Sequence, residues 1–148
     1  MKKNLLINTI LVFLFLNSNV FSKESNYFIE GMKHFDNREF DKSKIFFERD
    51  LVFNPKSEKS YLYLAKIFNN NNNDSEQEIN LNSDLLLNPQ NDEALYMLVL
   101  LKIKQSDYKH AKKLFDQFVS ICKSFCSKKN EIQEKFEKLT PENAKNNN

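Results

Sequence analysis

Two cysteines close together in the sequence are the side chains best placed to form a covalent bond with each other. Cys122 and Cys126 bound the stretch "CKSFC". Cysteines this close are usually oxidised together once a protein has been exported. In an undistorted helix their Cβ atoms would lie ~5–6 Å apart, whereas a disulfide needs about 3.8 Å. The sequence therefore predicts a local disulfide and a helix that unwinds at Cys126.

Two other uses of this cysteine pair stay open: a metal site, or a reactive thiol on which a thiol-dependent function would rest. A metal site would need further ligands, and no histidine lies nearby in the sequence. A redox-active pair normally has C-x-x-C spacing, which this pair lacks. The spacing favours a disulfide that holds the end of the folded region.

Apart from the cysteines, the sequence contains few residues or motifs that could support catalysis. His34 and His110 are the only histidines. The sequence has no histidine-rich metal motif, no glycine-rich phosphate loop and no nucleophile elbow. We therefore expect no enzyme activity, no metal and no cofactor, with one histidine packed and the other solvated.

The composition indicates a folded, all-α protein. The chain has 148 residues, which is room for one domain or a short repeat array. Hydrophobic residues make up 41 % and charged residues 28 %, a balance typical of folded proteins. One glycine and three prolines are too few for a β protein with many turns.

The N-terminus has the features of a secretory signal peptide. Lys2 and Lys3 precede an apolar run, Leu5–Leu16, and small side chains such as Ser22 follow it. We expect residues 1–22 to be removed and the protein to act in the periplasm of a Gram-negative bacterium. An uncleaved anchor is the alternative, although the run is short for a bilayer core of ~30 Å.

Removal of the signal peptide changes the charge of the chain. Lys2 and Lys3 leave and no acid leaves with them, so 22 basic and 20 acidic residues become 20 of each. A neutral domain gives no indication of nucleic-acid binding. No later stretch of the sequence resembles a membrane span.

Two similar short stretches of the sequence indicate an internal repeat. "RDLVFNPK" (Arg49–Lys56) and "SDLLLNPQ" (Ser83–Gln90) share Asp-Leu and Asn-Pro in register, at a 34-residue interval. Such a period is typical of solenoids. Applying the same 34-residue interval along the chain defines three units, residues 24–57, 58–91 and 92–125.

Each unit contains two amphipathic stretches with a break between them. Apolar residues follow helical spacing, as at Tyr61, Leu64, Ala65 and Phe68. Polar residues at the breaks are predicted to start helices; these are Asp41, Asn91, Asp107 and Ser75, the last within a capping box. After the third unit, residues 127–140 are expected to form a capping helix with an apolar stripe of Ile132, Phe136 and Leu139, and residues 141–148 a disordered tail.

This pattern resembles the tetratricopeptide repeat family, whose 34-residue unit is a helix-turn-helix with small residues where the two helices touch. The matching positions are Tyr27, Gly31, Phe35, Phe40, Ser43, Phe47, Leu51 and Pro55 in the first unit, Tyr61, Leu64, Ala65, Phe68, Leu85 and Pro89 in the second, and Leu95, Leu98, Tyr108, Ala111 and Phe115 in the third. The resemblance implies an α-α superhelix. Gly31 and Ala65 fit the small position, whereas Val99 implies a wider or shifted helix pair in the third unit.

The resemblance also implies a groove, lined by the first helix of each unit, that takes a protein or peptide. The equivalent positions here are Phe28, Met32, Phe35, Leu62, Lys66, Asn69, Tyr96, Leu100 and Ile103. The Lys and Asn with which some relatives grip a C-terminal carboxylate are replaced by apolar residues in the first unit. Two alternatives stay open: the N-terminal segment or the capping helix covers the groove, or a homo-oligomer buries it.

Two acids stand where this family usually keeps a small residue facing the next unit. Asp50 and Asp84 lie in the two similar stretches, at the 34-residue interval. A buried carboxylate is costly unless it is paired or hydrogen-bonded. We expect each to reach solvent or a polar neighbour such as Ser60, or to be offered to a basic partner.

Overall fold

The protein is built from helices alone over the part that the structure describes. The structure, a computed structural model, describes residues 24–144, and side chains only as far as residue 138. The predicted signal peptide therefore lies outside the described residues. The elements are α2 (Asn26–Asp36), α3 (Phe40–Phe53), α4 (Glu58–Asn70), α5 (Asp74–Leu87), α6 (Asp92–Lys104), α7 (Tyr108–Ile121), a short 3₁₀ turn η1 (Cys126–Lys128) and α8 (Lys129–Ala144). The prediction of an all-α protein is confirmed.

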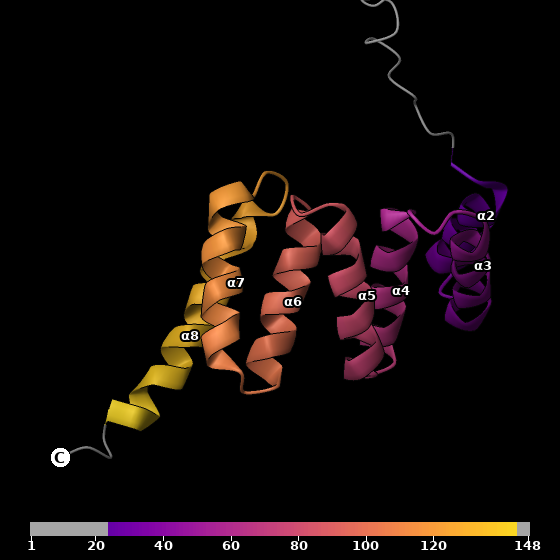
Figure 1. Ribbon diagram of the computed structural model, residues 1–148. Coiled ribbons are helices and arrows are strands. Elements are labelled where there is room, and N and C mark those ends of the chain that lie inside the picture. The colour runs from indigo at the N-terminus through magenta and orange to yellow at the C-terminus, as the bar shows by residue number, and fades with distance from the viewer. Residues whose placement is uncertain (1–23, 145–148) are drawn as a thin grey trace, which may run out of the picture.

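The helices pair in chain order. α2 packs against α3, α4 against α5, and α6 against α7, and the pairs are joined by contacts of α3 with α4 and of α5 with α6. Figure 1 shows the pairs following one another from α2 and α3 through α6 and α7, with α8 at the C-terminal end. This is the α-α superhelix that the 34-residue period predicts, because each pair buries one face against the next.

The turn inside each unit has the same backbone geometry. Arg38, Asn72 and Ser106 recur at the 34-residue period and have positive φ values of 59°, 55° and 60°. A residue in the left-handed region commonly ends a helix. In each turn the following N–H bonds back to the first helix, as from Asn73 N to Phe68 O at 2.9 Å. The polar run of asparagines in the second unit is therefore an ordinary turn.

Two helix starts lie earlier than predicted. Asn91 and Asp107 cap α6 and α7 through their side chains, as expected. However, Asn73 caps α5 by accepting from Glu76 N, so Ser75 lies within the first turn and the predicted capping box is wrong. Asp41 also lies inside a helix, because α3 begins at Phe40. The left-handed residue closes each turn so tightly that the next helix starts within two residues.

The C-terminal boundaries also differ from the prediction. Residues Cys126–Lys128 form a 3₁₀ turn, so α8 begins at Lys129 and not at residue 127. α8 continues to Ala144, so the expectation of a disordered tail is wrong for residues 141–144. Pro141 lies within the range of this helix. The side chain of Leu139 and residues 145–148 lie outside the described part.

The ring of Phe47 on the partner helix α3 explains why residue 31 is a glycine. Gly31 is buried, and a Cβ atom added there would lie only 2.7 Å from Cε1 of Phe47 on α3. The carbonyl of Gly31 also accepts a hydrogen bond of 2.8 Å from the hydroxyl of Ser43. In the third unit the larger Val99 is fully buried and belongs to one apolar cluster with Phe118. The wider or shifted helix pair expected in the third unit stays a prediction.

Candidate functional site

A cavity of about 460 Å³ lies between the first helices of the first and second units. Its apolar wall includes Phe28, Ile29 and Met32 from α2 and Leu62 and Tyr63 from α4. Phe28 and Leu62 are buried and form its floor, whereas Ile29 is 47 % exposed. We call this space the N-terminal cavity. It can hold an apolar side chain of a bound segment.

Two lysine–glutamate pairs belong to the lining of the N-terminal cavity. Lys66 Nζ lies 2.9 Å from Glu93 and 4.5 Å from the ring centroid of Tyr63. Lys59 Nζ lies 2.5 Å from Glu24. Burial, with the negative charge of Glu93, raises the pKa of Tyr63. Because each lysine already has a carboxylate partner, the cavity offers an apolar surface with neutralised edges and no free cationic clamp.

A second cavity, of about 260 Å³, lies between α4, α5 and α6. We call it the C-terminal cavity. Its lining residues are Asn69, Gln77, Tyr96, Met97, Leu100, Leu101 and Lys104. The apolar members all come from α6, so one helix supplies the apolar wall and its neighbours supply the amides.

The capping helix contacts one side of the groove. The hydroxyl of Tyr96 donates a 2.8 Å hydrogen bond to Glu131 on α8. The ring of Tyr96 lies 5.8 Å from that of Phe125, and Lys128 lies over it at 5.6 Å. Burial, reinforced by Glu131, raises the pKa of Tyr96. Self-coverage by the capping helix therefore reaches Tyr96.

The two cavities bring together most of the residues that the sequence predicts for the groove. Phe28, Met32, Leu62 and Lys66 line the N-terminal cavity, and Asn69, Tyr96 and Leu100 line the C-terminal one. The remaining two pack elsewhere: Phe35 against Phe40 and Tyr63, and Ile103 in the core of the third unit. Sequence reasoning missed Ile29, Tyr63, Gln77 and Met97. Its single stripe per helix is narrower than the surface that two neighbouring helices enclose.

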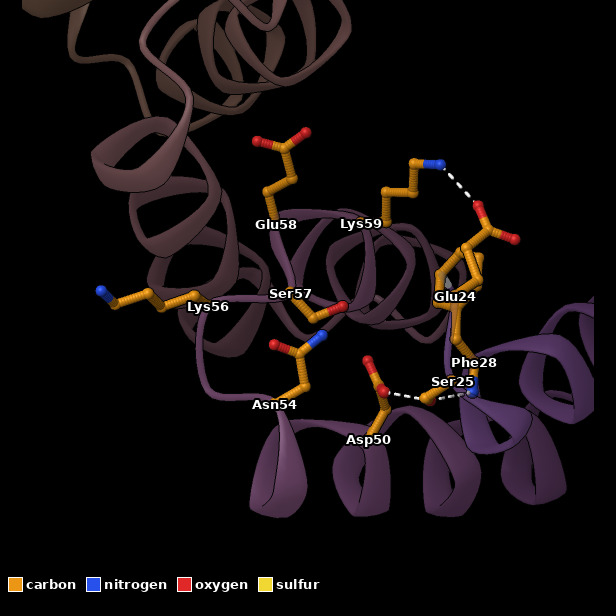
Figure 2. A pocket seen from close by; sticks show the side chains of 9 residues that line it. All are labelled: Glu24, Ser25, Phe28, Asp50, Asn54, Lys56, Ser57, Glu58 and Lys59. Atoms are coloured by element: carbon orange, nitrogen blue, oxygen red, sulfur yellow. Dashed lines mark hydrogen bonds and ion pairs between the residues drawn. The ribbon is translucent and has the colours of Figure 1, made fainter. Parts of the chain in front are cut away.

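The first of the two junction acids is fully buried and hydrogen-bonded. Asp50 accepts from the hydroxyls of Ser25 and Ser60. Ser25 is also the N-cap of α2, since its oxygen accepts from Phe28 N at 3.0 Å. Figure 2 shows Asp50 directed from α3 toward Ser25, in a cavity of about 350 Å³ that includes Asn54. Asp50 therefore joins the starts of two helices and does not reach bulk solvent.

The second junction acid has a different partner. Both carboxylate oxygens of the fully buried Asp84 accept from Asn91 Nδ2, at 3.0 and 2.9 Å. Asn91 is the N-cap of α6. Burial raises the pKa of Asp84 to about 7, and the hydrogen bond from Asn91 only partly opposes this. Neither acid is presented at the surface to a basic partner. Of the two expected environments, solvent or a polar neighbour, both acids have the polar neighbour, and for Asp50 it includes the predicted Ser60.

The cysteine pair forms a disulfide, with Cα atoms 5.2 Å apart. The prediction that the helix unwinds at Cys126 is wrong, because α7 already ends at Ile121. The backbone N–H groups of Lys123 and Phe125 donate to Asp92 at 2.7 and 2.9 Å. These bonds outweigh the effect of burial and lower the pKa of Asp92. An acid at the start of α6 thus holds the loop that the disulfide closes.

The two histidines form local pairs. His34 Nδ1 lies 2.5 Å from Glu39, and its ring stacks on Phe46. His110 Nδ1 lies 2.6 Å from the helix cap Asp107. Among the described residues no cluster of His, Cys, Asp or Glu is arranged to hold a metal ion. No described helix is long and apolar enough to cross a bilayer.

Comparison with known proteins identifies the fold. No model of a protein family matches the chain, and no curated protein does. Among solved structures, the chain is similar to the first TPR of Spaghetti (RPAP3) bound to the HSP90 peptide SRMEEVD, with a TM-score of 0.69 and 15 % identity over 76 % of this chain and 90 % of that one. It is also similar to the Sgt2 TPR domain from Aspergillus fumigatus, with a TM-score of 0.65 and 15 % identity over 76 % of this chain and 78 % of that one. The fold is therefore that of tetratricopeptide repeat domains, as the 34-residue period predicts.

Proposed function

We propose that this protein is a non-enzymatic module that binds a protein segment or peptide along the face formed by its first helices. The observation that carries the proposal is the pair of cavities on α2, α4 and α6, lined by apolar side chains at the positions implied by the repeat. The structure of RPAP3 with a bound HSP90 peptide supports it by analogy of fold. Apolar and aromatic residues, with methionine, suit adaptable peptide contacts.

The N-terminal cavity favours a segment with an apolar anchor. Met32 and the exposed Ile29 offer apolar surface beside the ion pairs of Lys59 and Lys66. The exposed Lys59–Glu24 pair contributes only ~0–1 kcal/mol, so a polar flank of the ligand could exchange with it. We expect apolar anchoring and not recognition of a terminal carboxylate.

Selection from a phage-displayed peptide library tests this proposal. The affinity of enriched peptides for the mature chain would be measured by fluorescence anisotropy. Ile29→Asp and Met32→Asp should each weaken binding by about tenfold or more, because central apolar contacts dominate such interfaces. Neither residue belongs to the fully buried core, so circular dichroism should show an intact fold. Phe28 and Leu62 are unsuitable for this test because they are buried.

The matched control is Val52→Asp on α3. Val52 is 74 % exposed and lines neither cavity. Peptide affinity should be the same as in the unaltered protein. The proposal fails if no peptide is enriched, or if enriched peptides bind the folded Ile29→Asp variant as tightly as the unaltered chain.

We further propose that the protein works in the periplasm of a Gram-negative bacterium, in envelope assembly or maturation. The disulfide between Cys122 and Cys126 supports an oxidising compartment. The predicted signal peptide supports export. N-terminal sequencing of the protein recovered from a Gram-negative host should begin at Lys23. Recovery of the intact N-terminus from the cytoplasm would contradict this placement.

Self-association is a second candidate function. Exposed apolar residues recur at 34-residue spacing on the second helices: Ile45 with Ile79, Val52 with Leu86, and Phe53 with Leu87. Exposed apolar patches often mark interfaces. Sedimentation velocity at high concentration would detect an oligomer, and a monomer would exclude this function. The Val52→Asp variant separates the two candidates, since it should weaken self-association and leave peptide binding unchanged.

A further inference from the structure

The C-terminal cavity includes a buried amide with an unsatisfied oxygen. Gln77 on α5 is only 3 % exposed and contributes to the lining. Its Oε1 atom is buried and has no hydrogen-bond donor among the described residues. Nearly all buried polar atoms in native proteins are hydrogen-bonded. This oxygen therefore needs a donor from outside the described structure.

The equivalent positions in the other units show that the fold does not require this amide. Ser43, one repeat earlier, is satisfied by donating to the carbonyl of Gly31 at 2.8 Å. Ala111, one repeat later, has no polar side-chain atom to satisfy. Both are buried like Gln77. A small residue would therefore serve the helix contact, and the longer amide of the second unit is an addition to it.

Three nearby side-chain donors of the chain are engaged with carboxylates. Lys104, which also lines the cavity, lies 2.6 Å from Asp74. Lys102 and Gln105 both donate to Glu78, at 2.6 and 3.0 Å. The pKa of Glu78 is lowered, first by Lys102, as expected for a stable pair. A bound group is thus better placed than these side chains to supply the missing donor.

The walls of the cavity define what such a group must look like. Tyr96, Met97, Leu100 and Leu101 form one apolar wall of the space, on α6. An aliphatic side chain would fit but would leave Oε1 of Gln77 unpaired. A lysine or arginine would place a charge against apolar walls, which is costly. An apolar ring with one O–H or N–H at its edge meets both requirements. Rotation about the soft terminal torsion of Gln77 can turn the oxygen toward that donor.

We propose that the C-terminal cavity is a specificity pocket for a tyrosine or tryptophan side chain of the bound segment. The ring packs on the α6 wall, and its O–H or N–H donates to Oε1 of Gln77. This proposal rests on the proposed function of the groove as a peptide site. The C-terminal cavity would select a ring that carries a hydrogen-bond donor, whereas the N-terminal cavity requires only an apolar side chain.

Matched small probes test the pocket on the mature full chain. p-Cresol and toluene share a ring and a methyl group, but only p-cresol carries a donor; 3-methylindole and 1,3-dimethylindole form the corresponding tryptophan pair. Each would be titrated into ¹⁵N-labelled protein and followed by two-dimensional NMR. The donor-bearing member of at least one pair should bind about fivefold to tenfold more tightly, as one additional hydrogen bond allows. The shifted resonances should include those of Leu100, Leu101 and the Gln77 amide.

The variant Gln77→Met keeps the length of the side chain and removes the acceptor. In this variant the preference for p-cresol or 3-methylindole should vanish while toluene binds at least as tightly as before. The control Gln105→Met makes the same change at an exposed amide outside the cavity. It should retain the preference seen in the unaltered chain.

Three results would overturn the pocket: no shift at its resonances with any probe, no preference for the donor-bearing member of either pair, or a preference that survives in Gln77→Met. The library selection distinguishes this failure from failure of the groove. Groove-binding peptides that lack tyrosine and tryptophan would uphold peptide binding and overturn the pocket. If the small probes show a preference that depends on Gln77 but the library yields no binding peptide, the pocket is upheld and peptide binding by the groove is not.

Discussion

The first two repeat junctions are built on carboxylates, and the third is built on a phenyl ring. Asp50, Asp84 and Phe118 occupy equivalent places in successive units, and all three are fully buried. The acids are held by side-chain donors at the starts of neighbouring helices. Phe118 instead packs in an apolar cluster with Ile132 of α8. The repeat determines that this position is buried, but it does not determine the chemistry that fills it.

The two acidic junctions also differ from each other. Asp50 accepts from two hydroxyls, Ser25 in its own unit and Ser60 in the next. Asp84 has a single side-chain donor, the amide of Asn91. Fewer donors leave more of the cost of burial uncompensated, which agrees with the raised pKa of Asp84. Ser25 and Asn91 are both helix N-caps, so each acid orients the start of a helix.

The largest expected effect comes from emptying the apolar junction. Phe118→Ala should lower the free energy of unfolding by about 3–5 kcal/mol, because it leaves a cavity between α6, α7 and α8. Urea denaturation followed by circular dichroism measures this loss. Val119→Ala, at the neighbouring half-exposed position, should change stability by less than about 0.5 kcal/mol. Equal losses in the two variants would mean that Phe118 is not central to the junction.

The acidic junction at Asp84 should make stability depend on pH. The folded-state pKa of about 7 lies above the ordinary value of 3.8, so the folded protein binds a proton more readily than the unfolded chain. The resulting stability is fully present below the unfolded pKa and is lost as pH rises through about 7. Between pH 5 and pH 8 the Asp84 contribution should fall by about 3 kcal/mol at most. Asp84→Asn should remove it.

Comparison of urea midpoints for the unaltered chain and Asp84→Asn at both pH values isolates this effect. Acids with lowered pKa values, such as Asp92 and Glu78, are ionised in both the folded and the unfolded chain across this range, so they add little to the dependence in either protein. The difference between the proteins should therefore be larger at pH 8, with the asparagine variant the more stable. A pH-independent difference would contradict the burial of an ionisable Asp84.

Removing the Asp50 carboxylate should lower the stability of the protein, in contrast to the gain expected for Asp84→Asn at pH 8. Asp50→Ala should destabilise the protein by about 2 kcal/mol, because it leaves the buried hydroxyl of Ser60 and the partly buried hydroxyl of Ser25 without their acceptor. The same denaturation measurement applies. Asp116→Ala, at an exposed acid on α7, is the control and should have little effect. A gain in stability on removal of Asp50 would show that its carboxylate only perturbs the packing.

The smallest expected effect concerns the disulfide at the end of the apolar junction. Replacing both Cys122 and Cys126 by serine should cost about 1–2 kcal/mol, since the closed loop is short. Hydrogen exchange should rise in η1 and α8, which follow this loop, while α2 and α3 keep their protection. Uniform acceleration across all helices would indicate that the disulfide supports the whole fold.

Much of the fold could be predicted because periodicity acts locally. The 34-residue repeat and the spacing of residues such as Leu64 and Phe68 place helices and their buried faces. Seven of the nine positions that the resemblance implies for the groove line one of the two cavities. Helix starts were harder: the cap at Asn73 follows from a left-handed turn at Asn72 that no glycine marks.

The candidate site was only partly predictable, because its walls come from more than one helix. Ile29 and Met97 lie beside the predicted stripe and not in it. Gln77 belongs to a second helix, and the resemblance places only first helices in the groove. The disulfide was predictable from spacing, but the end of α7 at Ile121 depends on the bonds that Asp92 makes to the loop.

The sequence by itself determined the number of units and the helical class, since these follow from period and hydrophobicity along one chain. It did not determine the burial of Asp50 and Asp84. Only the tertiary structure decided how the buried polar groups are satisfied. Ser25 reaches Asp50 across 25 residues, and Tyr96 reaches Glu131 across 35. A hydrogen bond requires its two atoms to lie within a few ångströms in a suitable direction. That geometry is set by how neighbouring helix pairs pack, and the sequence pattern does not specify it.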